Sequence, residues 1–296
     1  MILLRTMTWL SLRLGRPVAR CVLHGIAAYY FMFAPQPRRH ARVYLRRALG
    51  REPTALDRYR HLLSFATTIH DRLYLINGRY DLFDISLEGE GLLRARLRQH
   101  QGVFLMGAHL GSFEVVHALA RRQPGLSVAM AMYEHNAQKI NAMLAAINPT
   151  LSPDIIALGN LNSMLRIRAR LEQGTCVGVL GDRTLGAEPA MQVSFLGAPA
   201  AIPTSAMRAA AMLRCRVVFM TGLYRGSNRY HIVFTELADF SETSAPTRET
   251  AIRTAIRRYA ALLEQHCQRD PYNWFNFFDF WNPQQLPEAR HEVRGR

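Results

Sequence analysis

The chain is poor in several residue types, and each scarcity narrows the class of protein. Among 296 residues there are four cysteines, widely scattered, which argues against a zinc ribbon or a disulfide framework and fits a reducing compartment. Lysine is nearly absent, since Lys139 is the only one. No Gly-x-Ser-x-Gly sequence offers a nucleophilic serine, and there is no internal repeat, low-complexity tract or long linker. Hydrophobic residues make up 49% and charged residues 20%, which is typical of a folded chain with a full core.

Acidic residues are missing from the first 51 positions, where ten arginines contribute +10 of the formal net charge of +15. Residues 17–35 form an apolar stretch among these arginines, but Arg20 and His24 interrupt it, whereas a membrane span needs about 20 apolar residues. Residues 34–37 are also a poor signal-peptide cleavage site. We therefore expect a basic helix that lies in or dips into an anionic membrane surface on the cytoplasmic side, with an ordinary core helix as the alternative.

Apolar spacing beyond this region predicts an α/β fold. Apolar residues recur at helical spacing over residues 53–78, and from about residue 83 short apolar runs alternate with helical stretches. The expected strands are 103–108, 126–132, 154–158, 176–181, 217–221 and 230–235, and the expected helices are 113–122, 136–147, 160–173, 203–214 and 247–268. The alternation predicts a mostly parallel central sheet flanked by helices. We expect this α/β domain over residues 81–296, after an N-terminal membrane-associating helical region over residues 1–80.

The apolar run at 103–108 is followed by a histidine and then a carboxylate. Ser112 is a candidate cap for a helix beginning at Phe113, so His109 is expected in the turn at the carboxyl end of the strand. An ionised Glu114 in the first helical turn would fix the tautomer of His109, and the other ring nitrogen could take a proton from a hydroxyl or an amine. The alternative is a structural histidine after a strand, since the His-x4-Glu spacing also arises by chance.

Further polar groups are expected at the same edge of the sheet. Tyr133 and Asn136 follow the second strand, and Asp182 and Arg183 follow the strand at 176–181. An Asp–Arg pair there is suited to hold a substrate phosphate or carboxylate or to brace His109, and a local ion pair is the alternative. Residues 193–206 are expected to form a turn and then the start of a helix with small residues. The exposed amides at the start of that helix are suited to bind an anion or an oxyanion. The alternative is that its small residues only allow close packing.

Taken in order, these blocks resemble the lipid A biosynthesis acyltransferase family, part of the wider group of lysophospholipid acyltransferases. The resemblance runs from the basic N-terminal helix to about residue 281. It is carried by the His-x4-Glu block at 109–114, Tyr133 with Asn136, the strand ending in Asp182-Arg183, and the Phe-Leu-Gly-x-Pro-Ala turn at 195–200. It implies an enzyme at the cytoplasmic face of the bacterial inner membrane. Such an enzyme moves an acyl chain from acyl carrier protein or a coenzyme A thioester to a hydroxyl of a lipid or glycolipid.

The resemblance also implies roles for residues, in an acyl transfer without a covalent enzyme intermediate. His109 would be the general base and Glu114 its orienting partner, and the amides near Gly111 and Ser112, or Arg183, would stabilise the oxyanion. The other expected substrate contacts are Phe113, Tyr133, Asn136 and Asp182. Because the thioester is already activated, neither a metal nor an organic cofactor is expected. Acyl carrier proteins are acidic as a class, so the basic surface would favour docking of the donor as well as membrane attachment.

Two departures from the family pattern concern the acceptor. Members usually carry arginine after the tyrosine of the second block, whereas Glu134 stands here, and Arg183 is the substitute candidate. The ending, residues 273–281, is richer in aromatics than the usual tail. Together with residues 65–72 and 78–79 it looks like the acyltransferases encoded with aryl-polyene pigment pathways. The aromatic ending is suited to cover the core, to line an acyl groove or to lie at the membrane interface, and we favour the cover.

Three other functions are consistent with parts of the sequence. A nucleic-acid-binding protein would explain a pI of about 10.5, but the charge lies mainly beside an apolar segment and no nucleic-acid-binding motif is present. We therefore expect no nucleic-acid partner. The second is a catalytically inactive lipid-binding protein of the same fold, and the third is a hydrolase that uses the same dyad on a thioester.

Overall fold

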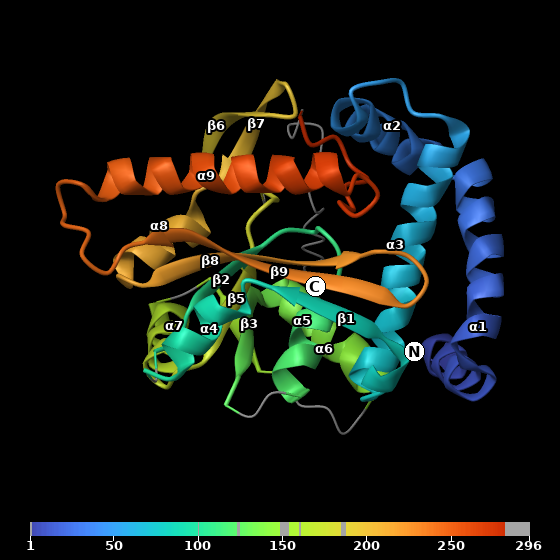
Figure 1. Cartoon of the computed structure of the whole chain (residues 1–296), viewed down its shortest axis with the longest axis horizontal. Helices are drawn as coiled ribbons and strands as arrows, with labels where there is room; N and C mark the ends of the chain where they lie inside the picture. Colours follow the sequence, from blue (N-terminus) through green and yellow to red (C-terminus); the bar gives the residue numbers. More distant parts are fainter. Residues whose placement is uncertain are drawn as a thin grey trace, which may run out of the picture.

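A seven-stranded sheet forms the centre of the protein (Figure 1). The computed structural model describes residues 2–99, 101–122, 125–148, 154–159, 161–184 and 188–281. The strands, in their order across the sheet, are β1 (Asp84–Glu88), β9 (Arg229–Asp239), β8 (Arg216–Tyr224), β2 (Phe104–Gly107), β5 (Cys176–Leu180), β3 (Val128–Tyr133) and β4 (Ile155–Leu158). From β8 to β4 all neighbours are parallel, whereas β9 is antiparallel to β8 and parallel to β1. The predicted α/β fold with a mostly parallel sheet flanked by helices is confirmed.

Helices cover both faces of this sheet, and the central strands are apolar on both faces as a result. In β2, Phe104 and Met106 join the core cluster that includes α9, whereas Leu105 joins the cluster that includes α5. Figure 1 shows α9 across one face and α5 and α6 on the other. The helices of the α/β part are α4 (Glu90–Leu97), α5 (Phe113–Arg122), α6 (Glu134–Ile147), α7 (Leu161–Glu172), α8 (Ser205–Met212) and α9 (Arg248–Arg269).

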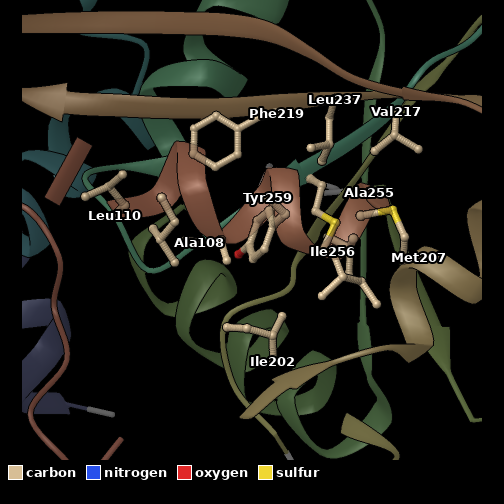
Figure 2. Packing of buried hydrophobic residues seen from close by; sticks show 14 of the residues in the cluster. Ala108, Leu110, Ile202, Met207, Val217, Phe219, Leu237, Ala255, Ile256 and Tyr259 are labelled. Carbon is tan, nitrogen blue, oxygen red and sulfur yellow. The ribbon is translucent and has the colours of Figure 1, made fainter. Parts of the chain in front are cut away.

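The core beneath α9 holds the end of β2 in place. Figure 2 shows Tyr259 of α9 pointing into the cluster beside Ala108 and Ile256, and its ring lies 5.9 Å from that of Phe219 on β8, centroid to centroid. The Tyr259 hydroxyl donates to the carbonyl of Gly107 at 2.9 Å. This bond ties α9 to the last residue of β2, directly before the predicted site.

Three helices precede the sheet: α1 (Ile2–Phe33), α2 (Pro35–Leu49) and α3 (Ala55–Ile76). Helical geometry in α1 is interrupted at Gly15, where φ is +80°. One residue later, Arg16 reaches Asp71 of α3 with two nitrogen–oxygen distances of 2.7 Å, and the hydroxyl of Tyr230 donates to the same carboxylate at 2.8 Å. Side chains of Arg16 and Asp71 are almost fully buried, so this pair fixes α1 alongside α3 (Figure 1).

No single helix in the described part of the chain has the length and apolarity of a membrane span. The segments Ser11–Phe33 and Pro35–Leu49 meet that test only as a pair, bent by 94° at their junction.

Several elements differ from those expected. Residues 190–203 form an antiparallel hairpin of β6 (Ala190–Phe195) and β7 (Ala198–Pro203), turning at Leu196 and Gly197, both with positive φ. The expected turn and the expected helix start are both present within residues 193–206, since α8 begins at Ser205, but the pairing of residues 198–203 with β6 was not expected. The strand β1 and the helix α4 were not expected from the sequence either.

Candidate active site

The loop after β2 carries His109 to the carboxyl edge of the sheet. β2 ends at Gly107 and α5 begins at Phe113, close to the expected boundaries. β5 is a parallel neighbour of β2, and Gly107 lies opposite Leu180 in the register. His109 and Asp182 each follow two residues after that pair, so the two chains emerge from the sheet side by side.

Asp182 contacts His109 at two points. The ring Nδ1 of His109 lies 2.8 Å from Oδ1 of Asp182, and the backbone N–H of His109 donates to Oδ2 at 3.1 Å. Burial by itself would raise the pKa of Asp182, but His109, Arg183 and the indole N–H of Trp274 together hold the pKa of that carboxyl well below its usual range. An ionised Asp182 accepts the Nδ1 proton, so the free lone pair of a neutral imidazole is on Nε2. The His109 side chain is 32% exposed, which leaves it open to a substrate.

The two loop amides expected to bind an oxyanion both donate to backbone carbonyls of the protein. Gly111 N–H donates to the carbonyl of Asn273, and Ser112 N–H donates to the carbonyl of Gly222, each at 2.8 Å. Gly111 has φ +74°, and a Cβ there would lie 2.1 Å from the Gly222 carbonyl oxygen, so only glycine fits. The amides of Gly111 and Ser112, expected to stabilise an oxyanion, are therefore already paired with backbone carbonyls, which favours the alternative donor, Arg183. The buried hydroxyl of Ser112 also has no partner in the described structure, so the expected cap of α5 is not formed.

Glu114 contacts a different partner from the one expected. Its Oε1 lies 2.8 Å from Nε of Arg72 on α3, and each of the two side chains is about one-fifth exposed. The structure does not bring Glu114 to His109 as expected, because α5 packs against α3 and its first turn presents Glu114 to Arg72. Asp182 makes the contact with His109 instead, in line with the alternative that the acid after β5 braces the histidine.

Phe113 and Glu114 also border a small cavity between α3, α5 and α6. Phe113 packs over Gly178 of β5, where a Cβ would lie 2.9 Å from the phenyl ring. The remaining lining residues are Leu75, Ile76, His117, Ala118, Arg121, Met130 and Leu144.

Arg183 belongs to the same cluster as His109. Its Nη2 donates to the carbonyl of Phe275 at 3.0 Å, and its guanidinium lies 5.1 Å from the ring centroid of Phe278. Burial lowers the pKa of Arg183, against the opposing effect of Asp182. Its buried Nε has no partner in the part of the chain that the structure describes. Arg183 is therefore a charged group of the site that still has an unpaired N–H to donate.

Tyr133 and Asn136 lie at the end of β3 and the start of α6, as expected, but not next to His109. β5 separates β3 from β2 in the sheet. Burial and the neighbouring carboxylate of Glu188 raise the pKa of Tyr133, whose hydroxyl bonds to Glu188. Asn136 is exposed on α6.

Residues 273–276 are part of the site that sequence reasoning missed. Trp274 is completely buried, and its indole N–H donates to Oδ2 of Asp182 at 3.0 Å. Phe275 N–H donates to the carbonyl of His109 at 2.8 Å. The favoured interpretation of this segment as a core cover is correct but incomplete. The available signal was a tryptophan within an apolar run, because a buried indole N–H needs an acceptor.

A histidine held by a buried carboxylate at the carboxyl edge of a mostly parallel sheet defines an α/β protein equipped for proton transfer with a bound substrate. Among the described residues, no three histidine, cysteine or acidic side chains are grouped to hold a metal ion.

The chain belongs to the bacterial lipid A biosynthesis acyltransferase family, which it matches over residues 2–282. It is therefore an acyltransferase, and in general terms its reaction needs an acyl donor and a lipid acceptor. The resemblance drawn from the motifs is confirmed at the level of this family. No curated protein matches the chain.

Proposed function

We propose that the protein transfers an acyl chain from an acyl carrier protein or coenzyme A thioester to a hydroxyl of a lipid or glycolipid. The observation that supports this most directly is the pairing of His109 Nδ1 with the buried Asp182 carboxylate, since it directs the lone pair of Nε2 to a partly exposed position. A neutral imidazole held in one tautomer is a suitable base for an alcohol at neutral pH.

The proposed reaction needs no covalent enzyme intermediate. His109 Nε2 removes the proton of the acceptor hydroxyl as its oxygen bonds to the thioester carbonyl carbon, and Asp182 stabilises the imidazolium that forms. Arg183 is our candidate for stabilising the oxyanion, because both loop amides are engaged elsewhere. Collapse of the tetrahedral intermediate breaks the carbon–sulfur bond, and the imidazolium protonates the leaving thiolate. The products are an ester and a free thiol. Glu114 is proposed to act at the rim of the site through its ion pair with Arg72.

The membrane side of the proposal rests on α1. Apolar side chains on this helix stay exposed in the fold, and nine of the ten arginines in the first 51 residues lie on α1 and α2. We propose that this surface holds the enzyme on the cytoplasmic face of the inner membrane, with residues 1–80 as the attachment region and residues 81–296 as the catalytic domain. The exposed set is Trp9, Leu14, Val18, Val22, Tyr29, Tyr30, Met32 and Phe33.

The net charge of the protein indicates the acyl donor, and the departures from the family pattern indicate the acceptor. An acidic acyl carrier protein is favoured by a net charge of +15. The acceptor is proposed to be an aryl-polyene lipid or a lipid A precursor. Glu134 and the aromatic ending favour the former.

The test compares lipids of the native host that carries wild-type protein or His109→Ala. We expect one acylated lipid species to disappear, and the purified variant to transfer acyl groups on the order of 10²- to 10⁴-fold more slowly. His231→Ala is the control, because both ring nitrogens of His231 are occupied by Ser86 and Glu88 on β1.

Product analysis separates the competing functions. Free fatty acid without acylated lipid would indicate a hydrolase. An unchanged lipid profile, with the His109→Ala variant folded and bound to membranes, would reject the catalytic assignment and favour a lipid-binding protein.

A further inference from the structure

The segment Asn273 to Asn276 runs beside the His109 loop and is bonded to it at Asn273 and Phe275. Leu110 forms a β-bridge with Trp274, and the backbone bonds from Gly111 to Asn273 and from Phe275 to His109 flank this bridge. The side chain of Asn273 both accepts from and donates to the backbone of Tyr224, at 2.7 and 3.1 Å. The segment is therefore fixed to the end of β8 as well as to the loop.

The carboxylate of Asp182 has three donors, and Trp274 supplies the one that does not come from His109. Oδ1 faces the imidazole, while Oδ2 accepts the His109 backbone N–H at 3.1 Å and the Trp274 indole N–H at 3.0 Å. A carboxylate held through both oxygens cannot rotate about its bond to Cβ without losing a charge-assisted hydrogen bond. The indole therefore fixes the plane in which Oδ1 meets the imidazole.

Packing fixes the indole in turn. Trp274 is completely buried, and its ring meets those of Tyr44, Phe195 and Phe280 edge to face at centroid distances of 4.9, 5.3 and 4.9 Å. The carbonyl of Trp274 accepts a bond from Nε2 of His61 at 2.8 Å. Burial lowers the pKa of His61 to about 4, so this histidine is neutral at pH 7 and donates from one defined tautomer.

We propose that Trp274 is a positioning residue for acyl transfer: its indole N–H holds the Asp182 carboxylate in the orientation that aligns His109. This inference rests on the proposed function of His109. Trp274 itself touches neither the reacting atoms nor the substrate, and it acts through Asp182.

Loss of the indole N–H has a defined electrostatic consequence. The titratable groups around Asp182 are the His109 imidazole and the Arg183 guanidinium, together with the hydroxyl of Tyr259 and the thiol of Cys267 on α9. With one donor fewer, more of the carboxylate charge is available to His109. The imidazolium is then more stable, and the acid limb of the pH–rate profile moves to higher pH. The carboxylate is also less well oriented, which lowers kcat.

The experiment compares Trp274→Phe with the matched variant Trp281→Phe in the full chain. Trp281 lies in the same aromatic cluster, but its indole faces the carbonyl of Phe195. Thiol release from dodecanoyl-coenzyme A in the presence of host lipid extract gives kcat, KM and the pH profile. NMR titration of the His109 ring gives a readout that needs no activity.

For Trp274→Phe we expect kcat to fall about tenfold, the scale of one charge-assisted hydrogen bond, with KM for the thioester nearly unchanged. The acid limb and the His109 titration both move to higher pH. Trp281→Phe changes none of these. If Trp274→Phe unfolds the protein, 3-benzothienylalanine at position 274 replaces it, because that analogue keeps the ring shape and lacks the N–H.

An unchanged His109 titration and acid limb in a folded Trp274 variant would overturn the inference, even if kcat fell. Failure of the proposed function has a different signature, which is full activity in His109→Ala. The two results are independent because the NMR titration follows the ring of His109 whatever reaction the enzyme performs.

Discussion

The sequence offered two carboxylates, Asp182 and Glu114, as partners for His109. Their surroundings in the fold give them different roles. Asp182 is completely enclosed and receives three hydrogen bonds, two of them from His109. Glu114 is partly exposed and pairs with the permanent charge of Arg72. A buried carboxylate stays ionised only when it accepts such hydrogen bonds. The bonds from His109 and Trp274 therefore keep Asp182 ionised, and Asp182 in turn orients His109.

This difference leads to a prediction about pH dependence. In Asp182→Asn the imidazolium loses its anionic partner, so we expect the acid limb of the pH–rate profile to move to lower pH. The asparagine amide can also donate to Nδ1 and leave the proton on Nε2, which removes the base, so kcat should fall at least about 10²-fold. The measurement is the pH dependence of thiol release from an acyl-coenzyme A.

Glu114→Gln is the isosteric comparison for this prediction. Whatever rate this variant loses, its acid limb should stay at the wild-type pH, because Glu114 is paired with Arg72 on α3. A shift of the acid limb in Glu114→Gln but not in Asp182→Asn would reverse the assignment of the two carboxylates.

The sequence predicted each half of this site, but it offered their pairing only as one alternative for the Asp182–Arg183 pair. His109 and Asp182 were each expected at the carboxyl end of a strand, and both are there. What joins them is the neighbouring position of β2 and β5, strands separated by two others along the chain. Sheet order depends on the packing of whole helices across the sheet, and no local pattern around residue 109 or 182 contains it. Trp274 was missed for the same reason, since its acceptor lies 92 positions away.

At the scale of elements, prediction succeeded where both faces of a strand are buried. β2 and β5 are continuous apolar runs and were found within a residue or two of their ends. In contrast, β1 alternates between exposed and half-buried positions and contains Asp84, Ser86 and Glu88, so it lacks such a run. The β6–β7 hairpin was missed because small residues and two prolines in β7 are typical of turns and helix starts.

The exposed face of α1 gives a prediction for membrane binding. Tyr30 and Phe33 are more than half exposed near the end of this helix, where each aromatic ring that enters an interface contributes about 1.5–3 kcal/mol. We expect Tyr30→Ser combined with Phe33→Ser to weaken binding to anionic phospholipid vesicles at least about tenfold without changing the unfolding temperature. Vesicle co-sedimentation and thermal unfolding are the two measurements.

Leu165→Ser provides a matched control, because Leu165 is 59% exposed on α7, within the α/β part of the chain. Binding of this variant should equal that of the wild type. Equal binding by the wild type and the Tyr30/Phe33 variant would show that this face of α1 does not enter the membrane.

At the scale of the whole molecule, three enclosed histidines make the fold sensitive to mild acid. Burial lowers the pKa of His61, His117 and His266 to about 4 in each case, with Arg121 adding to the effect at His117. In the unfolded chain a histidine has a pKa of about 6.5. At pH 7 the three are neutral in both states. As the pH falls below about 6.5, these histidines become protonated in the unfolded chain but stay neutral in the folded protein. The free energy of unfolding therefore decreases until the pH reaches about 4.

Each of these histidines should cost on the order of 2 kcal/mol of unfolding free energy between pH 7 and pH 5. The carboxylates with lowered pKa values, Asp57 and Asp182, act only at lower pH, because the unfolded chain protonates its aspartates near pH 4.

Urea denaturation at pH 7 and pH 5 measures the difference. His266→Phe keeps a ring stacked on Phe219. In this variant the decrease in unfolding free energy from pH 7 to pH 5 should be smaller than in the wild type by the contribution of one histidine. The pH 7 measurement of the same variant is its control for packing, since a repacked ring changes both values equally. A loss of stability as large in His266→Phe as in the wild type would show that His266 takes up its proton within the folded protein.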